Sequence, residues 1–153
     1  MASQSKGSAR ERRALASYIT LLRAANTASS RAFKHLDQHG VTPSQFAVLE
    51  ALYHVGPMCL TDLARKILRT SGNLTMVVDN LEKSGMVKRV HSARDRRYIS
   101  VEITDKGRAL IAKIFPEHAA QVAEVMSRLT AEEQDTLREL CRKLGVGAEE
   151  SAS

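Results

Sequence analysis

The chain has 153 residues, a net charge of +6 and a pI of about 9.6, a length that suits one domain or one domain with dimerising arms. Hydrophobic residues make up 43% and aromatic residues 4%, with no Trp, so an aliphatic core is expected. The apolar runs are too short to cross a membrane, and the N-terminus lacks the apolar region of a secretory signal, which predicts a cytoplasmic protein with no membrane partner.

Residues 1–9 are polar and are predicted to form a disordered arm, after which the chain reads as a helix. In that helix Leu15, Ile19 and Leu22 recur at spacings of four and three residues, which is typical of one apolar helix face. Gly40 is expected to end the helix. The next helix has a complete start signal, because Thr42 and Gln45 can form a capping box around Pro43.

Two helices are predicted between Gly56-Pro57 and Gly85. The first is short and directs Leu60, Leu63, Ala64 and Ile67 inward. The second is amphipathic, and its apolar stripe consists of Leu74, Val77, Val78 and Leu81. Its opposite face presents Ser71, Asn73, Thr75, Met76 and Asn80. The candidate contact residues of this helix are Thr70, Ser71, Gly72, Asn73, Thr75 and Met76.

A hairpin with a basic tip is predicted after Gly85. The strand that starts at Tyr98 alternates apolar Ile99, Val101 and Ile103 with polar residues, the pattern of a half-buried strand. The connecting loop holds Arg94, Asp95, Arg96 and Arg97. Such a loop can simply be solvated, or it can contact an anion. Residues 60–100 contain nine Lys/Arg and four Asp/Glu, and this local excess favours a polyanionic partner, nucleic acid first.

Two helices are predicted in the last third of the chain. Thr104-Asp105 opens one that extends to about Leu129, in which Pro116 is expected to introduce a kink or a break. The other begins with Thr130 as its cap and Glu133 three residues later, and Gly145 is expected to end it. Its apolar stripe consists of Leu137, Leu140, Cys141 and Leu144.

A short helix followed by an amphipathic helix and a hairpin is the order of a helix-turn-helix with a wing. The small residues Ser71 and Gly72 would let the backbone approach the major groove, and Asn73 could pair with a base edge. Thr70 or Ser71, with the helix N-terminus, could hold a phosphate. The wing arginines would lie over the backbone or the minor groove. Asp95 is expected to orient an arginine side chain.

The segments "LTDLARKI", "SGNLTMVVDNLEKSGMVKRV", "DRRYISVEITDKG" and "LTAEEQDTLRELCRKL" resemble the MarR family of transcriptional regulators. The resemblance implies a mainly α (α+β) fold, a winged helix-turn-helix whose N- and C-terminal helices form a dimerisation region. It implies a DNA-binding lobe at 41–107, dimerisation helices at 10–40 and 108–146, and a disordered tail at 147–153.

The resemblance also implies a homodimer, a pseudo-palindromic promoter site on double-stranded DNA, and an effector or redox input in the crevice between the dimer helices and the lobe. Arg97 matches the residue that enters the minor groove, whereas Ser92 stands where the family often has an acidic residue. The interface residues are expected to include Leu15, Ile19, Leu137, Leu140 and Leu144.

Several further residues have competing interpretations. Tyr18, Phe33, Phe46 and Tyr53 could line a pocket for an aromatic or phenolic effector, or belong to an ordinary core. His35 and His39 have a spacing that can hold a metal on a helix, but solvation at a helix end is the favoured reading, and no metal or cofactor is predicted.

The favoured hypothesis is a sequence-specific repressor that a ligand releases from DNA. One alternative is a redox sensor that uses Cys59, although a buried Cys59 or Cys141 would act as a small hydrophobe. A nonspecific architectural protein or membrane-surface binder would need only charge. An enzyme is not predicted, because the sequence shows no nucleophile–base spacing and no Gly-rich phosphate loop.

Overall fold

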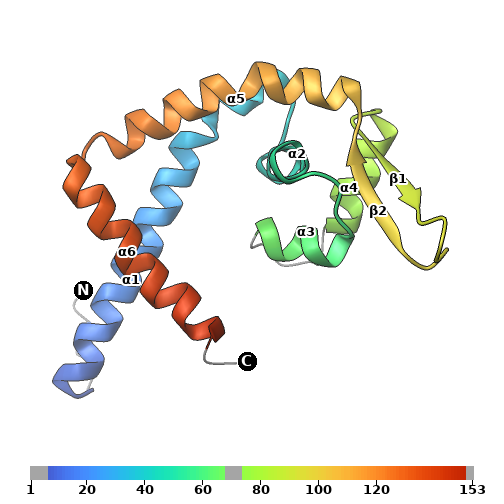
Figure 1. Ribbon diagram of the computed structural model, residues 1–153. Coiled ribbons are helices and arrows are strands. Elements are labelled where there is room, and N and C mark those ends of the chain that lie inside the picture. Colours follow the sequence, from blue (N-terminus) through green and yellow to red (C-terminus); the bar gives the residue numbers. More distant parts are fainter. Residues whose placement is uncertain (1–6, 68–73, 151–153) are drawn as a thin grey trace. The chain divides into compact units, whose positions relative to one another are not determined.

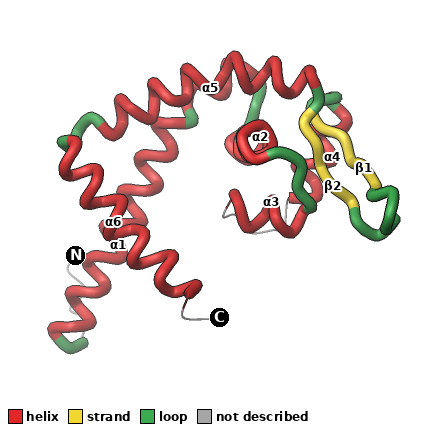
Figure 2. The backbone as a smooth tube through the Cα atoms, in the orientation of Figure 1, coloured by secondary structure: helices red, strands yellow, loops and turns green. Residues whose placement is uncertain are grey.

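The computed structural model describes residues 7–67 and 74–150 (Figures 1 and 2). The elements follow in the order α1 (Ala9–Ala32), the 3-10 helix η1 (Lys34–His39), α2 (Pro43–Val55), α3 (Leu60–Ile67), α4 (Leu74–Lys83), β1 (Val87–His91), β2 (Ile99–Ile103), α5 (Asp105–Met126) and α6 (Ala131–Glu150). The chain forms two compact units. One spans Phe33–Ala119, and the other combines α1 with the segment from Ala120 onward.

The hydrophobic core of the chain lies in the unit Phe33–Ala119. Helices α2, α3 and α4 pack on one another, α2 and α3 also pack on β2, and α4 packs on β1. The first half of α5 adds Ile111 and Ile114. The side chains that are almost wholly buried are Leu36, Phe46, Val48, Leu49, Leu52, Leu63, Val78, Val87, Val101, Ile111 and Ile114. The aliphatic core expected from composition is therefore confirmed, with Phe46 as its aromatic member.

The local start signals of α2 and α6 work as predicted. The Thr42 hydroxyl accepts from the Gln45 backbone N–H at 3.1 Å, and the Gln45 side chain accepts from the Thr42 N–H at 3.0 Å. At α6 the Thr130 hydroxyl accepts from the Glu133 N–H at 3.2 Å. These bonds satisfy donors that the first helical turn leaves without partners, which is why both boundaries could be predicted from sequence.

The first helix ends earlier than predicted. It stops at Ala32, and a separate 3-10 helix of six residues, Lys34–His39, lies directly before Gly40, which adopts φ 65° and caps η1 instead. The expectation that the histidines of this segment are solvated is also wrong. His35 is buried, with its ring 5.4 Å from that of His118, and the His39 Nε2 lies 2.9 Å from the Glu117 carboxylate. Tertiary packing of η1 on α5 therefore overrides the local helix pattern.

The two strands form the predicted antiparallel hairpin. Val87 pairs with Ile103 at its base, and His91 pairs with Ile99 next to the loop. Val101, at the centre of β2, also forms a bridge with Met58, with N–H to carbonyl distances of 3.2 and 2.7 Å. This extra pairing fixes the segment before α3 to the hairpin, so the helices and the wing form one packed unit (Figure 2).

The start of α5 is joined tightly to the turn between α4 and β1. The Thr104 hydroxyl donates to the Gly85 carbonyl at 2.6 Å and accepts from the Gly107 N–H, and the Lys106 ammonium donates to the Ser84 carbonyl at 2.8 Å. Gly107 lies directly against this turn: a Cβ atom there would be 2.2 Å from the Met86 carbonyl oxygen. The residues of the sequence "ITDKG" therefore hold the start of α5 against the turn that follows α4.

The second unit is built from long helices with few buried side chains. A capping box that sequence analysis missed starts α1: the Glu11 carboxylate accepts from the Ser8 N–H, and this hydrogen bond lowers the pKa of Glu11. Helix α5 continues through Pro116, so the proline does not interrupt it. The prediction that Gly145 ends α6 is wrong, because this helix extends to Glu150. Across the described part of the chain, no helix is apolar over a length that would cross a bilayer.

We predict that Gly107→Ala destabilises the fold by about 1–3 kcal/mol or more, because the methyl group would collide with a backbone carbonyl that cannot rotate away. The measurement is the free energy of unfolding in urea. Gly145→Ala is the matched control: nothing lies within 4 Å of its Cβ position, and alanine favours the helix by about 0.5–1 kcal/mol. Equal effects of the two substitutions would contradict the proposed close contact at Gly107.

Candidate nucleic-acid interface

Helix α4 buries one face and leaves the other open. Leu74, Val78 and Leu81 are buried against the core of the unit. The opposite face carries Thr75 and Met76, both exposed, with Met76 64% accessible. An exposed methionine next to a threonine on a helix that packs on α2 and α3 matches the predicted second helix of a helix-turn-helix. The remaining predicted contact residues of this helix, Thr70, Ser71, Gly72 and Asn73, lie outside the described residues.

The wing loop is a hydrogen-bonded turn rather than a loose connection. The Ser92 hydroxyl accepts from the backbone N–H groups of Arg94 and Asp95 at 3.2 and 3.4 Å. The Asp95 carboxylate accepts from the Arg97 N–H at 3.0 Å, and its carbonyl accepts from the Tyr98 N–H. Ser92 thus supplies an acceptor to the loop without adding a negative charge, although an acidic residue often stands here in the family it resembles.

The role predicted for Asp95 needs correction. It was expected to orient an arginine side chain, but its carboxylate bonds the backbone of Arg97 instead. An aspartate that accepts from the N–H two residues later forms an Asx turn, which fixes the local backbone. Asp95 therefore determines where Arg97 leaves the loop, while the guanidinium itself stays available.

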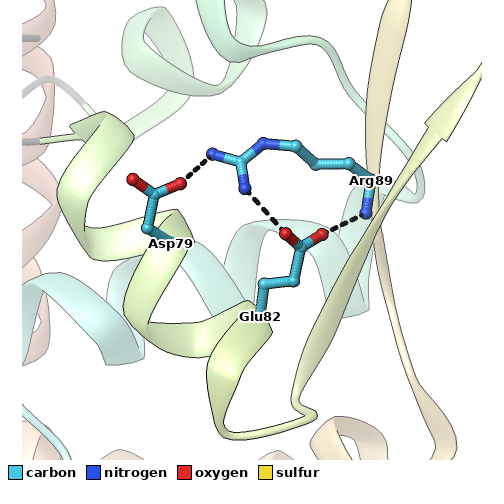
Figure 3. Close-up of polar contacts among 3 residues, drawn as sticks. All are labelled: Asp79, Glu82 and Arg89. Carbon is cyan, nitrogen blue, oxygen red and sulfur yellow. Dashed lines mark hydrogen bonds and ion pairs between the residues drawn. The ribbon is translucent and has the colours of Figure 1, made fainter.

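The basic residues of the hairpin fall into two groups. Arg94, Arg96 and Arg97 at the tip are exposed, and within the described part of the chain none of their guanidinium groups is in an ion pair. Lys88 and Arg89 on β1 are already paired, Lys88 with Glu102 at 3.7 Å and Arg89 with two carboxylates of α4 (Figure 3). Within the hairpin, the positive charge that can attract a polyanion is therefore concentrated at the tip of the wing.

The pairing of Arg89 with Asp79 and Glu82 was missed by sequence analysis, in which these residues count only among the nine basic and four acidic residues of 60–100. A signal was present, because Asp79 and Glu82 are three residues apart and share one face of a helix. The sequence could not say that β1 would return along that face.

The four aromatic residues proposed for an effector pocket do not share one environment. Tyr18 belongs to α1 and is 58% exposed, whereas Phe46 is in the core of the other unit. Phe33 meets Phe46 edge-on with ring centroids 6.3 Å apart, and Tyr53 meets the ring of His54. Phe33 and Phe46 also lie against the His118 ring at 5.4 and 4.5 Å. The structure thus brings Phe33 and Phe46 together and adds His118, which sequence analysis did not select.

The two cysteines differ in exposure. Cys59 is partly buried immediately before α3, and Cys141 is exposed on α6. Cys141 lines a groove of about 720 Å³ formed by α1, the end of α5 and α6, together with Leu21, Leu129 and Leu137. Cys141, on the apolar stripe predicted for this helix, is therefore exposed in the single chain.

Comparison with known proteins agrees with this geometry. The family model described as MarR family matches residues 41–99. The transcriptional regulator MhqR of Bacillus subtilis is 41% identical over 87% of this chain and 92% of its own length. The structure is similar to that of Sco3205 of Streptomyces coelicolor, solved in complex with DNA (TM-score 0.79, 26% identity, 96% of this chain and 92% of that one).

A second solved relative is BpsR of Bordetella bronchiseptica, whose DNA binding is regulated by 6-hydroxynicotinic acid. It has a TM-score of 0.74 and 26% identity, over 82% of this chain and 89% of that one. These relatives are regulators rather than enzymes. The winged-helix fold expected from the sequence is confirmed.

We predict that Arg97→Ala weakens DNA binding and lowers the slope of log affinity against log salt by about one, since one phosphate contact is lost. Anisotropy titrations at several salt concentrations measure both quantities. Arg138→Ala is the control, because it removes the same charge from an exposed position of α6. A slope that changes equally in both variants would contradict a direct contact by Arg97.

Proposed function

Because this chain belongs to the MarR family of DNA-binding transcriptional regulators, we propose that it acts in the cytoplasm as a homodimeric repressor that a small ligand releases from a pseudo-palindromic promoter site. The observation that carries the proposal is the wing tip, where three exposed arginines project from a hydrogen-bonded turn while the other basic residues of the hairpin are neutralised. Arginines that project from a hydrogen-bonded backbone, with no ion pair among the described residues, suit a groove of DNA.

The division of labour along the chain follows the two units. The DNA-binding lobe is proposed at 41–107, where α3, α4 and the hairpin lie. In the recognition helix the proposed contacts are Thr75 and Met76, with Thr70, Ser71, Gly72 and Asn73 at its start. Arg94, Arg96 and Arg97 are the proposed wing contacts, with Asp95 fixing the backbone from which Arg97 projects.

Dimerisation is proposed through α1 and α6, because these helices present large apolar side chains to solvent. Leu15 is 48% exposed, Ile19 43% and Leu137 37%, while Leu140 and Leu144 are 60% and 66% exposed. Several large apolar side chains exposed on the same helices are typical of an interface, which a second copy of the chain would cover with the same surface. A dimer would also place two recognition helices at successive major grooves, about 34–36 Å apart.

The effector is proposed to be a small aromatic or phenolic compound, as the ligand named for BpsR is a hydroxylated aromatic acid. Phe33 is half-buried and available as a contact, whereas Phe46 is 1% exposed and would act as a wall behind it. Tyr53 belongs to the same unit and stays a candidate, whereas Tyr18 lies on α1 in the other unit and is not proposed as part of this pocket. Repression is proposed because a dimer on promoter DNA occupies the surface that RNA polymerase needs.

The proposal predicts sequence-specific binding, which fluorescence anisotropy can test with a duplex from the region upstream of the protein's own gene. A random duplex of equal length is the competitor, and each is titrated over a salt series. Specific regulators prefer their site by about a thousandfold or more at physiological salt. Equal affinity for both duplexes with equal salt slopes would instead favour a nonspecific architectural protein.

We further predict that Leu140→Asp shifts the protein from dimer to monomer, since a carboxylate cannot be buried unpaired in an apolar interface. Sedimentation equilibrium measures the change. Thr136→Asp in the same helix is the control, because it introduces the same charge at another exposed position. A Leu140→Asp protein that stays dimeric and folded would place the interface elsewhere.

A further inference from the structure

The side chain of Arg89 connects the hairpin to α4. Its Nη2 lies 2.6 Å from Asp79 Oδ1, and its Nη1 lies 3.0 Å from Glu82 Oε1. The second oxygen of Glu82 accepts from the backbone N–H of Arg89 at 2.9 Å. One residue of β1 thus makes three hydrogen bonds to two carboxylates that lie three residues apart on α4 (Figure 3).

These bonds hold a defined geometry. The Arg89 side chain is 21% exposed, while Asp79 and Glu82 are 49% and 42% exposed. A guanidinium has a planar fork of donors that can bond two carboxylates at once, whereas an ammonium is a single point charge. The partial burial of Arg89 also protects the pair from the screening that makes exposed salt bridges weak.

The position of this contact relates it to both proposed DNA-contacting elements. On α4, Asp79 is three residues after Met76, which stands on the exposed face. On β1, Arg89 is three residues before Ser92, whose hydroxyl organises the wing loop. Any change in the angle or register between α4 and β1 would therefore move Met76 and Thr75 relative to the wing arginines.

The charges argue against a direct role of Arg89 on DNA. Two carboxylates surround one guanidinium, so the cluster has a net negative charge and would not attract phosphate. We propose that Arg89 is a positioning residue, which sets the recognition helix and the wing at the separation that the specific DNA site requires. This inference rests on the proposed DNA-binding function and adds a residue that determines specificity without touching DNA.

The test compares Arg89→Lys, Arg89→Gln and Asp79→Asn with the wild type on two duplexes over a salt series. One duplex is selected by the wild-type protein from a random library, and the other is an unselected duplex of equal length. Lys88→Gln is the matched control, because it removes one charge from the adjacent residue of β1, which forms an ion pair with Glu102 across the hairpin. Thermal unfolding verifies that each variant is folded.

We expect Arg89→Lys to bind the selected duplex about tenfold more weakly, which corresponds to about 1.4 kcal/mol. Its affinity for the unselected duplex should hardly change, and its salt slope should equal that of the wild type. Arg89→Gln should behave in the same way. Lys88→Gln should not reduce the preference for the selected duplex. The lysine variant is informative because it keeps the charge and loses the fork.

A double-mutant cycle connects the two partners. If Asp79 acts through Arg89, the variant with both Asp79→Asn and Arg89→Gln should lose no more specificity than Arg89→Gln alone. Additive losses would overturn the inference. Asp79→Asn leaves both bonds to Glu82 in place, so it gives a second reading should an Arg89 variant fail to fold.

Other outcomes would also decide the matter. A slope lowered by about one in Arg89→Gln, with equal losses on both duplexes, would make Arg89 a phosphate contact and overturn the inference. A lower melting temperature with an unchanged preference would make the ion pair purely structural and overturn it as well. A wild-type protein that selects no duplex from the library would overturn the proposed function and, with it, this role of Arg89.

Discussion

The contact between the start of α5 and the turn after α4 is the constraint on which the DNA-binding unit depends. Four elements meet there, because the turn ends α4 and begins β1, while Thr104 ends β2 and Gly107 lies in the first turn of α5. The Met86 carbonyl accepts from the Thr104 N–H at 3.0 Å while the Cα of Gly107 packs against it. Only glycine permits this approach, because it has no Cβ atom. The hairpin, the recognition helix and α5 can therefore meet at one junction (Figure 1).

Environment, and not residue type, separates the roles of the basic residues in the hairpin. Arg89 is partly buried between two carboxylates of α4, so its ion pairs hold β1 against that helix. The tip arginines have a backbone scaffold from Ser92 and Asp95 but no ion-pair partner in the described residues, so their charge remains available. A count of basic residues treats both groups alike. Such a count overstates the positive charge that DNA would meet, and it does not distinguish Arg89, the proposed positioning residue, from the tip arginines.

The sequence predicted those features that depend on local chemistry. The capping box at Thr42, the N-cap at Thr130 and the hairpin with its alternating strand were predicted correctly, because each is decided by residues within a few positions. The errors arose where distant contacts decide. Packing of His35 beside His118 and the bond from His39 to Glu117 belong to η1 and α5, which are far apart in the chain. The prediction that Gly145 ends α6 failed for a local reason instead. A glycine only weakens a helix interior, so this helix continues past it.

The candidate site was predictable in composition but not in geometry. The basic tip was found from the sequence, whereas the bond from Asp95 to the Arg97 backbone and the bridge from Arg89 to Asp79 and Glu82 needed the fold. Short polar side chains can bond either backbone or side chains at similar distances, so pattern alone does not decide between them. The predicted contacts from Thr70 to Asn73 lie outside the described residues and stay predictions.

The distribution of buried residues limits how a ligand could control DNA binding. Almost all of the core belongs to the unit Phe33–Ala119, while α1 contributes Ala32 and α6 none among the residues whose burial is described. The lobe therefore has its own core and should keep its internal geometry, including the Arg89 contacts, whether or not ligand is bound. In the proposed dimer, a ligand would then act on the separation of the two lobes, and its effect cannot exceed its difference in affinity for the two separations. To shift the ratio of the two separations from 99:1 to 1:99, the ligand must bind one of them about ten-thousandfold more tightly than the other. A difference in affinity of that size favours a pocket whose walls come from more than one element.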